Sequence, residues 1–311
     1  MSLRKFKYYT SNALLSLIPY ACQRYFAQMM IRSYASNPSE YIDGRVNYYN
    51  KLHTKFELPE TESTRVSEFK KTGGNTYYFD LKKVIKGFLP GERFAYLNGD
   101  IRTIPEYPTF LKSRPIEGDN ANSVVLKLNE IRHFNFINDE IPFEDKLDKV
   151  VWRGVGYQPH RQVVIHNFYD HPMCNIGQTK PQKGDPWEKG FVSIEEQLKY
   201  KFILAIEGND VATNLKWAMS SNSLVIMSKP RYETWFMEGR LEPGKHYVQV
   251  KADYSDLIEK VEYYLANPDE AKAIINNANL WTEQFKDKKQ EKLISLLVAD
   301  KYFNLNTTPE M

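Results

Sequence analysis

The sequence of 311 residues contains only two cysteines, Cys22 and Cys174, which are too few for a disulfide framework. This scarcity favours a protein of a reducing compartment. The chain also lacks the G-x-G-x-x-G, P-loop and G-x-S-x-G patterns. Hydride transfer, ATP hydrolysis and serine hydrolysis therefore each lack their usual signature.

Metal-binding patterns are equally scarce. No Asp-x-Asp pair occurs, although such a pair commonly holds a cation on a diphosphate. His166 and Asp170 stand about one helical turn apart, in a segment that also contains His160, His171 and Cys174. No two of these residues have the spacing of a known metal motif. We therefore predict no metal site and no cofactor.

The bulk composition excludes two further classes of protein. The net charge of +3 is too small for a general nucleic-acid-binding protein. Apolar residues make up 42 % of the chain, which excludes wholesale disorder, and the length suits two domains. The aromatic content of 14 % fits either clefts that hold ring-shaped groups or ordinary aromatic cores.

Acidic residues are absent from residues 1–39. An apolar run at residues 13–22 lies in this segment and is too short to span a bilayer. We interpret residues 1–35 as a basic amphipathic segment that makes peripheral contact with an anionic membrane. An ordinary first helix and the core of a signal peptide are the alternatives, although Gln23 and Arg24 fit a cleavage site poorly. The basic residues of the segment are Arg4, Lys5, Lys7, Arg24 and Arg32.

The most regular pattern lies at residues 199–227. Residues 202–206 form a short continuous apolar run, which is typical of a strand buried on both faces. A turn at residues 207–210 precedes a helix whose apolar face carries Val211, Leu215 and Ala218, and residues 224–227 are the next buried strand. Ligands of open α/β sheets bind beyond the carboxyl ends of the strands, at helix N-termini. We therefore expect an anionic ligand near residues 207–216.

Strands and helices alternate from residue 150 onward, which predicts a doubly wound α/β domain of the nucleotide-binding type. The first half reads as a less regular α/β unit. It includes one long helix over residues 8–34, a strand over residues 77–81 that runs into a helix, and a strand over residues 94–97. The charged and weakly periodic residues 143–149 mark the boundary between the two domains.

Two groups of residues carry the predicted chemistry. Arg153 and Gly154 follow a strand, while Arg161 and Lys216 lie in the first or second turns of their helices, where a diphosphate would be held. Taken singly, each cation is more often a solvated surface charge, and it is the coincidence of the three in one α/β domain that favours a diphosphate site. Asp100 ends another strand and could serve as a general base. An aspartate that bonds its own turn is the alternative on local grounds.

The chain resembles glycosyltransferase family 90, whose members include capsule xylosyltransferases, protein O-glucosyltransferases and bacterial lipopolysaccharide-modifying transferases. The resemblance runs from about residue 94 to about residue 278, and it is closest to the bacterial branch. It rests on an ordered set of motifs: residues 151–154 with Arg161, 199–202, 207–210, 215–217, 220–224, 241–243 with 246–247, and 253–257.

The resemblance implies an α/β fold of the GT-B type, with two Rossmann-like domains facing across a cleft. The predicted domains are an acceptor-side domain over residues 1–147, a donor domain over residues 148–285, and a C-terminal helix over residues 286–311 that returns to the first domain. The activity implied is metal-independent, inverting transfer of a sugar from a UDP-sugar to a hydroxyl of a glycan.

The resemblance also implies roles for individual residues. Asp100, with Pro105 following, falls on the catalytic aspartate, and Arg161 falls on the phosphate-binding arginine. Asn214 stands where animal members carry an arginine, and Lys216 is expected to supply that charge. The donor-binding residues predicted are Arg153, Gly154, Arg161, Glu207, Gly208, Asn209, Asp210, Thr213, Asn214, Lys216 and Ser220. The residues predicted to contact acceptor or sugar are Lys112, Arg114, Tyr157 and Trp235.

The expected partners are therefore a UDP-sugar and a glycan or glycolipid acceptor, such as lipopolysaccharide core or another surface polysaccharide. The expected location is the cytoplasm, peripheral to the inner membrane face. Two other readings use the same residues. One is a non-catalytic carbohydrate- or nucleotide-binding protein, and the other is a nucleotide-sugar hydrolase or epimerase.

Overall fold

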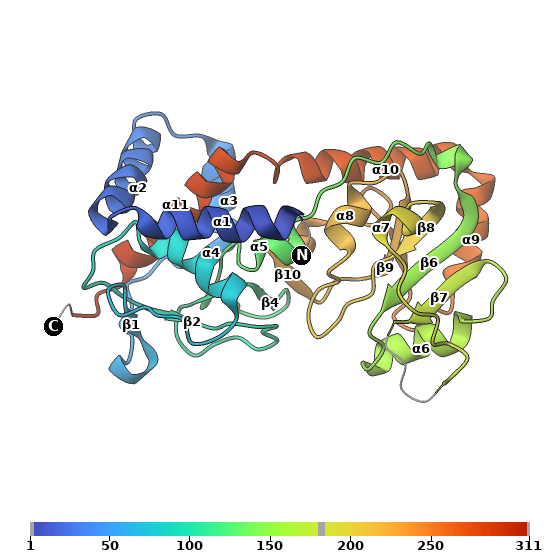
Figure 1. Cartoon of the computed structure of the whole chain (residues 1–311), viewed down its shortest axis with the longest axis horizontal. Coiled ribbons are helices and arrows are strands. Elements are labelled where there is room, and N and C mark those ends of the chain that lie inside the picture. Colours follow the sequence, from blue (N-terminus) through green and yellow to red (C-terminus); the bar gives the residue numbers. More distant parts are fainter. Residues whose placement is uncertain (1–2, 180–183, 310–311) are drawn as a thin grey trace. The chain divides into compact units, whose positions relative to one another are not determined.

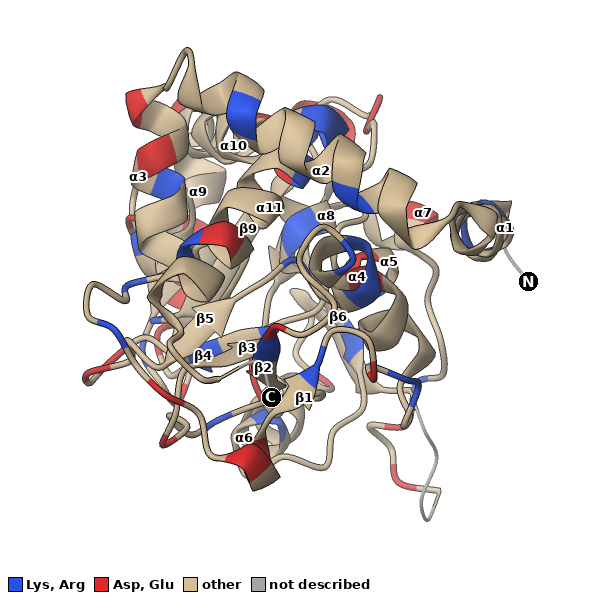
Figure 2. Cartoon of the chain, turned by 90° about the vertical axis from the view of Figure 1, so that its left-hand side faces the viewer, with Lys and Arg blue, Asp and Glu red and all other residues tan. Residues whose placement is uncertain are grey.

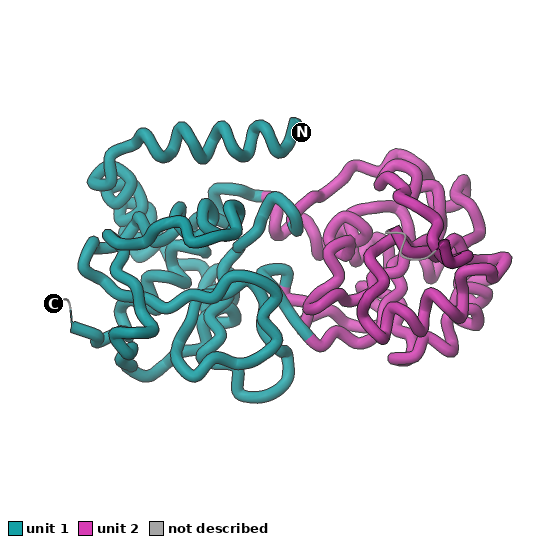
Figure 3. Tube along the Cα trace, turned by 60° about the horizontal axis from the view of Figure 1, so that its bottom comes forward, with its two compact units in different colours: residues 1–133, 232–236, 287–311 teal, residues 134–231, 237–286 magenta. Residues whose placement is uncertain are grey.

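The computed structural model describes residues 3–179 and 184–309 (Figure 1). The chain divides into two units, each formed by segments that are distant in sequence (Figure 3). Unit 1 comprises Met1–His133, Tyr232–Phe236 and Asp287–Met311. Unit 2 comprises Phe134–Arg231 and Met237–Lys286. The last helix of the chain therefore belongs to unit 1, whose first segment ends before the charged stretch at residues 143–149.

Unit 2 is built on a five-stranded sheet in which every pair of neighbours is parallel. Residues 202–204 and 224–227 are continuous apolar runs, as expected for central strands buried on both faces, and Phe202, Leu204 and Ile226 belong to one buried core. The strands are, in spatial order, β11 (Val248–Val250), β9 (Leu224–Ser228), β8 (Tyr200–Leu204), β6 (Leu147–Gly154) and β7 (Cys174–Gln178).

Helices of unit 2 pack their apolar sides into the same core. Val164 and Ile165 of one helix, Leu257 of a second and Ile274 of a third are buried in it. The helices are α6 (Pro159–Phe168), α7 (Ile194–Gln197), α8 (Leu215–Met219), α9 (Leu257–Ala266) and α10 (Pro268–Glu283), with short 3-10 helices η2 (Phe143–Asp145) and η3 (Glu238–Arg240). Ser193 caps α7 as its spacing to Glu196 predicts, since its hydroxyl accepts from the Glu196 N–H at 3.1 Å.

Unit 1 contains a smaller, mixed sheet with the order β1-β2-β3-β5. Strands β2, β3 and β5 are parallel, β1 is antiparallel to β2, and β4 pairs antiparallel with β10 in a separate ribbon. These strands are β1 (Thr64–Arg65), β2 (Arg93–Tyr96), β3 (Thr109–Leu111), β4 (Ser113–Pro115), β5 (Ser123–Val125) and β10 (Tyr232–Thr234). Both units are thus α/β in class, with parallel strands in each.

The helices of unit 1 include two departures from the sequence-based expectations. The helix expected over residues 8–34 is two helices, because Pro19 lacks the N–H that would continue the first. Residues 77–81 are helical instead of extended, and Tyr77, Leu81 and Ile85 are buried at four-residue spacing on one face. The helices are α1 (Leu3–Leu17), α2 (Tyr20–Ala35), α3 (Glu40–Tyr49), α4 (Asn75–Ile85), α5 (Glu130–His133) and α11 (Lys288–Leu305), with the 3-10 helix η1 (Glu60–Glu62).

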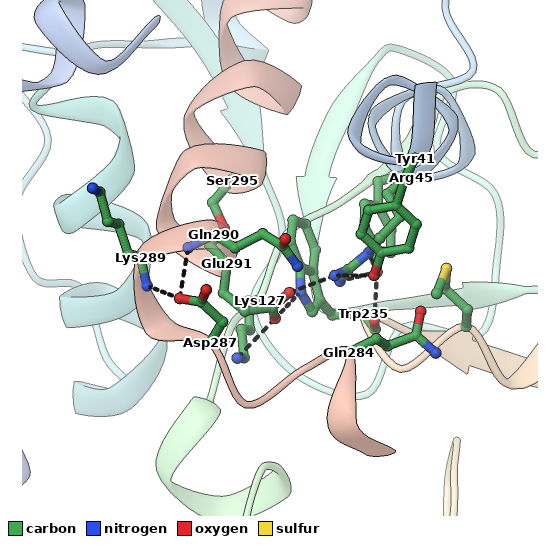
Figure 4. Close-up of polar contacts among 12 residues, drawn as sticks. Tyr41, Arg45, Lys127, Trp235, Gln284, Asp287, Lys289, Gln290, Glu291 and Ser295 are labelled. Carbon is green, nitrogen blue, oxygen red and sulfur yellow. Dashed lines mark hydrogen bonds and ion pairs between the residues drawn. The ribbon is translucent and has the colours of Figure 1, made fainter. Parts of the chain in front are cut away.

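A buried carboxylate ties α11 to the rest of unit 1 (Figure 4). Glu291 forms ion pairs with Arg45 of α3 at 2.6 Å and with Lys127 at 2.9 Å. Its Oε2 also accepts from the indole N–H of Trp235 at 2.7 Å, and that ring stacks on Tyr49 at 3.8 Å. Three segments that are far from α11 in the sequence therefore converge on its acidic side chain.

Candidate functional site at the β6–β8 switch point

The strand order of unit 2 creates one place where the chain reverses its direction across the sheet. From β6 the chain moves to β7 at one edge and then returns past β6 to β8, β9 and β11. This is the doubly wound order 2-1-3-4-5, whose switch point lies between the first and third strands. In open α/β sheets the crevice outside the carboxyl ends of these two strands is the usual ligand site. The candidate site therefore consists of the side chains beyond the ends of β6 and β8.

Arg161 joins the two strand ends at this switch point. It lies in the first turn of α6, with its guanidinium 5.3 Å from the Trp152 ring. One terminal nitrogen donates to the Val155 carbonyl after β6 at 2.8 Å, and the other donates to the Ile206 carbonyl after β8 at 2.9 Å. Its Nε donates to the Glu207 carbonyl at 2.8 Å. A permanent positive charge is thereby fixed where strands β6 and β8 end.

The turn after β8 lies against this charge. A Cβ on Gly208 would lie 3.3 Å from an Arg161 terminal nitrogen, so only glycine lets the guanidinium approach this closely without displacement. The Glu207 carboxylate accepts from both the backbone N–H and the Nε of Arg231, each at 2.8 Å. His160 Nε2 donates to the Glu207 carbonyl at 2.8 Å. Two arginines and one carboxylate therefore meet at the carboxyl edge of the sheet.

The rest of the predicted donor segment divides between this turn and the core. Asn209 accepts from the Gln158 amide at 3.2 Å, and Thr213 is half-buried before α8. Asn214 donates to the Leu204 carbonyl at 2.7 Å, which folds the segment back onto the end of β8. Asp210 is buried. Ser220 is also buried, with its hydroxyl donating to the Trp217 carbonyl at 3.0 Å and accepting from the Ile137 N–H at 3.1 Å.

Helix α8 is shorter than the sequence pattern predicts. It spans only Leu215–Met219, and residues 208–214 form bends and turns. Every residue of α8 is buried, so the helix is a core element. The expectation of a helix N-terminus directly after residue 210 is therefore wrong. The helix N-terminus that accompanies the switch point is that of α6, which contains Arg161.

Arg153 and Lys216 do not join Arg161. Trp152 and Arg153 are adjacent in β6 and point to opposite faces of the sheet. Arg153 donates to the carbonyl and the side-chain oxygen of Asn175 in β7, each at 2.6 Å, and burial lowers the pKa of Arg153. Gly154 ends β6 against the Trp152 ring. Lys216 is fully buried and forms an ion pair with the buried Glu238.

Asp100 lies in unit 1, in the loop that follows β2. Its Oδ1 is 2.6 Å from Nζ of Lys112, a residue with almost no exposed surface. The Asp100 carboxylate remains about one quarter exposed. The structure thus brings together the residue predicted as base and one residue predicted to contact the acceptor.

Of the other predicted acceptor contacts, only Tyr157 is exposed. Arg114 has no exposed surface, and its Nε donates to Glu233 at 2.8 Å while its other nitrogens donate to the carbonyls of Tyr48, Tyr49 and Ser123. Trp235 is equally buried in the Glu291 cluster. The contacts of Arg114 and Trp235 are those of residues that hold unit 1 together.

Arg231 and His160 are the residues of this edge that the sequence reasoning left out of the site. Arg231 comes shortly after β9 in the sequence, so the rule that ligands bind beyond strand ends could have found it. The sequence pattern around His160 suggests only a candidate metal site. In that segment His166 lies against Trp187, and Cys174 belongs to β7. Residues 3–179 and 184–309 contain no group of three His, Cys, Asp or Glu side chains placed to share a metal ion.

No helix in the described part of the chain is both long enough and apolar enough to cross a bilayer. Cys22 is exposed and Cys174 is buried, and both thiols are free.

Comparison with known proteins confirms the resemblance carried by the motifs. The model of glycosyl transferase family 90 matches residues 107–303. The O-glucosyltransferase LpsA of Dichelobacter nodosus is 44 % identical over 305 residues, which cover 97 % of this chain and 96 % of that protein. Human protein O-glucosyltransferase 3 is 40 % identical over 143 residues, which cover 44 % of this chain and 28 % of that protein. Zebrafish (Danio rerio) protein O-glucosyltransferase 2 is 27 % identical over 140 residues.

Proposed function

This chain belongs to glycosyl transferase family 90 and is a glycosyltransferase, and from that premise we propose that it transfers glucose from UDP-glucose to a hydroxyl group of a glycan. The acceptor proposed is lipopolysaccharide core or another surface polysaccharide. The choice of glucose and of a bacterial glycan rests on the similarity to the O-glucosyltransferase LpsA over almost the whole chain. We further propose that units 1 and 2 correspond to the two domains of a GT-B enzyme.

The observation that carries the proposal is the position of Arg161 at the β6–β8 switch point. Transfer leaves negative charge on the diphosphate as the glycosidic bond breaks, and a fixed cation stabilises that charge without reorganisation. Arg161 is such a cation. Arg231 is a second one, and both arginines contact Glu207, Arg161 at its backbone carbonyl and Arg231 at its carboxylate. Glycine at position 208 leaves the space in which a backbone N–H and phosphate oxygens approach each other. The Glu207 carboxylate is an acceptor suited to ribose hydroxyls.

The proposed reaction is a single displacement at C1 of glucose. An acceptor hydroxyl gives its proton to the Asp100 carboxylate, and the acceptor oxygen forms a bond to C1. The bond between C1 and the diphosphate oxygen breaks, and UDP leaves with the electron pair. Attack on the face opposite the leaving group inverts the configuration at C1. Lys112 would hold the Asp100 carboxylate in place through their ion pair of 2.6 Å.

The test is a product assay with the purified chain. We expect UDP release from UDP-glucose to depend on a glycan acceptor and to exceed release from UDP-xylose, UDP-galactose and UDP-N-acetylglucosamine. NMR of the product should show inverted configuration at C1. UDP release without glycosylated product would identify a hydrolase, and UDP binding without turnover on any acceptor would identify a binding protein. A product of retained configuration would exclude the direct displacement.

A further inference from the structure

Helix α1 has its apolar side toward solvent. Leu3, Phe6, Leu14 and Leu17 recur at helical spacing and are between 54 % and 79 % exposed. The opposite side meets α4 and is largely polar. Asn12 is buried there, and the Tyr8 hydroxyl donates to Asp80 at 2.7 Å. A helix on the surface of a water-soluble domain normally has the reverse arrangement.

Helix α2 repeats this arrangement. Tyr25, Phe26 and Met29 are exposed at helical spacing, whereas Ala27 on the other side is buried. Of the 19 large hydrophobic side chains that are exposed in the described residues, nine lie in residues 3–29. Isolated exposed hydrophobic side chains are ordinary, but a concentration of this kind marks an interaction surface.

The charge of the same segment identifies the partner. Residues 1–39 carry five basic residues and no acidic residue, although the whole chain has a net charge of only +3. Figure 2 colours the Lys and Arg positions of the ribbon blue, including those of α2. Lys7 follows Phe6 of the apolar face, and Arg32 lies one turn beyond Met29. Apolar side chains flanked by cations match a lipid surface with anionic headgroups.

We propose that the outward faces of α1 and α2 bind peripherally to an anionic bilayer, with the apolar side chains among the acyl chains and the basic residues at the headgroups. The helices lie in the membrane interface and do not cross it, in keeping with the absence of any described helix fit to span a bilayer. The inference does not rest on the proposed donor, acceptor or catalytic residues. It would place a glycosyltransferase at the surface where lipid-linked acceptors are presented.

The primary test measures binding of the full chain to vesicles by co-sedimentation. We expect binding to phosphatidylethanolamine vesicles that contain phosphatidylglycerol, little binding to phosphatidylcholine vesicles, and loss of binding as salt is raised. The double variant Leu14→Gln/Leu17→Gln should weaken binding at least about tenfold, because two leucines no longer leave water. Lys5→Gln/Lys7→Gln should weaken binding only to the anionic vesicles. Leu280→Gln, at a similarly exposed leucine of α10, is the matched control and should change nothing.

Cys22 provides an independent readout because it lies on the same side of α2 as Tyr25 and Met29. A thiol-reactive, environment-sensitive fluorophore should label Cys22 alone, since Cys174 is buried and burial raises the pKa of the Cys174 thiol to about 12. Its emission should shift to the blue on addition of anionic vesicles. An unshifted emission, or equal binding to both vesicle types, would overturn the proposal.

Two further outcomes would assign the apolar faces to another occupant. A dimer in light scattering that dissociates in the Leu14→Gln/Leu17→Gln variant would show that the faces join two copies of the chain. A fall in melting temperature of that variant, with no change in Leu280→Gln, would show that the protein itself covers them. We expect a monomer in lipid-free solution and unchanged melting temperatures.

Discussion

The Nε of Arg161 donates to the backbone carbonyl of Glu207 at 2.8 Å, so a side chain from the first turn of α6 holds the chain where it leaves β8. Arg161 also donates to the Val155 carbonyl, on the chain that leaves β6. The same guanidinium thus organises both sides of the switch point and supplies its charge. These two functions can be separated by experiment, because the first affects folding and the second affects ligand affinity.

Replacing Arg161 by alanine should weaken UDP binding by about 1.5–3 kcal/mol, or roughly 10- to 150-fold in Kd, the range for hydrogen bonds to charged groups. Arg161→Lys should recover part of the affinity, since it keeps the charge and loses the fork of donors. Isothermal titration calorimetry measures both. Lys272→Ala, an exposed lysine of α10, is the control. Unchanged affinity in Arg161→Ala, with the chain folded, would remove Arg161 from the donor site.

Arg231 should contribute to donor affinity with little effect on folding. Its side chain is 60 % exposed, so its ion pair with Glu207 is worth about 0–1 kcal/mol of stability. We expect Arg231→Ala to raise the KM for UDP-glucose by about tenfold, the scale of one weak charge-assisted contact, and to leave the melting temperature nearly constant. Lys245→Ala, paired with Glu242 on the surface, should leave both quantities unchanged. An unaltered KM would place Arg231 outside the site.

Asp100→Asn should abolish most of the transfer and leave UDP binding intact. The amide keeps the shape of the side chain but cannot accept the hydroxyl proton, so kcat should fall by about 10²–10⁴-fold. Calorimetry with UDP should give the same Kd as the unmodified chain. Asp119→Asn, in an exposed loop of unit 1, serves as the comparison. Normal turnover in Asp100→Asn would exclude this residue as the base.

The ion pair between Lys216 and Glu238 should prove to be structural. Both side chains are buried, so Lys216→Met removes the ammonium that pairs with a buried carboxylate and should cost about 3–5 kcal/mol of unfolding free energy. The double variant Lys216→Met/Glu238→Leu removes both charges and should recover most of that loss. Guanidinium unfolding measures each value. A folded Lys216→Met variant of normal stability but poor UDP affinity would instead return Lys216 to the donor site.

His246 should make unit 2 less stable as the pH falls. Burial lowers the pKa of His246 below its ordinary value of 6.5, Lys245 lowers it further, and Glu242 opposes them more weakly. In the folded chain Nδ1 accepts from the Glu242 N–H at 3.0 Å, which requires the neutral ring. The unfolded chain binds a proton at higher pH than the folded chain does. The contribution of neutral His246 to the free energy of unfolding is therefore fully present above about pH 6.5, and it is lost as the pH falls below that value.

The measurement is the free energy of unfolding as a function of pH. His246→Asn keeps an acceptor near the position of Nδ1 and does not titrate, so it should flatten the slope between about pH 7 and pH 5. The exposed His53→Asn should leave the slope as it is. Equal slopes in all three proteins would show that His246 does not govern this range.

The short-range pattern of apolar residues was sufficient to predict most of the strands and helices of unit 2. Continuous apolar runs predicted strands β6, β8 and β9, and Pro159 marked the first turn of α6. The same reasoning failed at residues 77–81 and 208–214. In the first segment aromatic residues favour a strand, yet the buried positions recur with helical spacing. In residues 208–214, Asn214 donates to the Leu204 carbonyl just before α8 begins at Leu215. Hydrophobic periodicity does not reveal a contact of this kind.

By itself the sequence determined the family, the α/β class and the position of Arg161 at a strand end, because these depend on local motifs and on residue spacing. Only the tertiary structure decided which charges share a site. Arg153 donates to the side chain of Asn175, and Lys216 forms an ion pair with Glu238. The cation that lies beside Glu207 is instead Arg231, which the sequence analysis does not include in the site. The physical reason is that a charge is neutralised or presented according to its neighbours in space, and those neighbours come from strands and loops far apart in the chain.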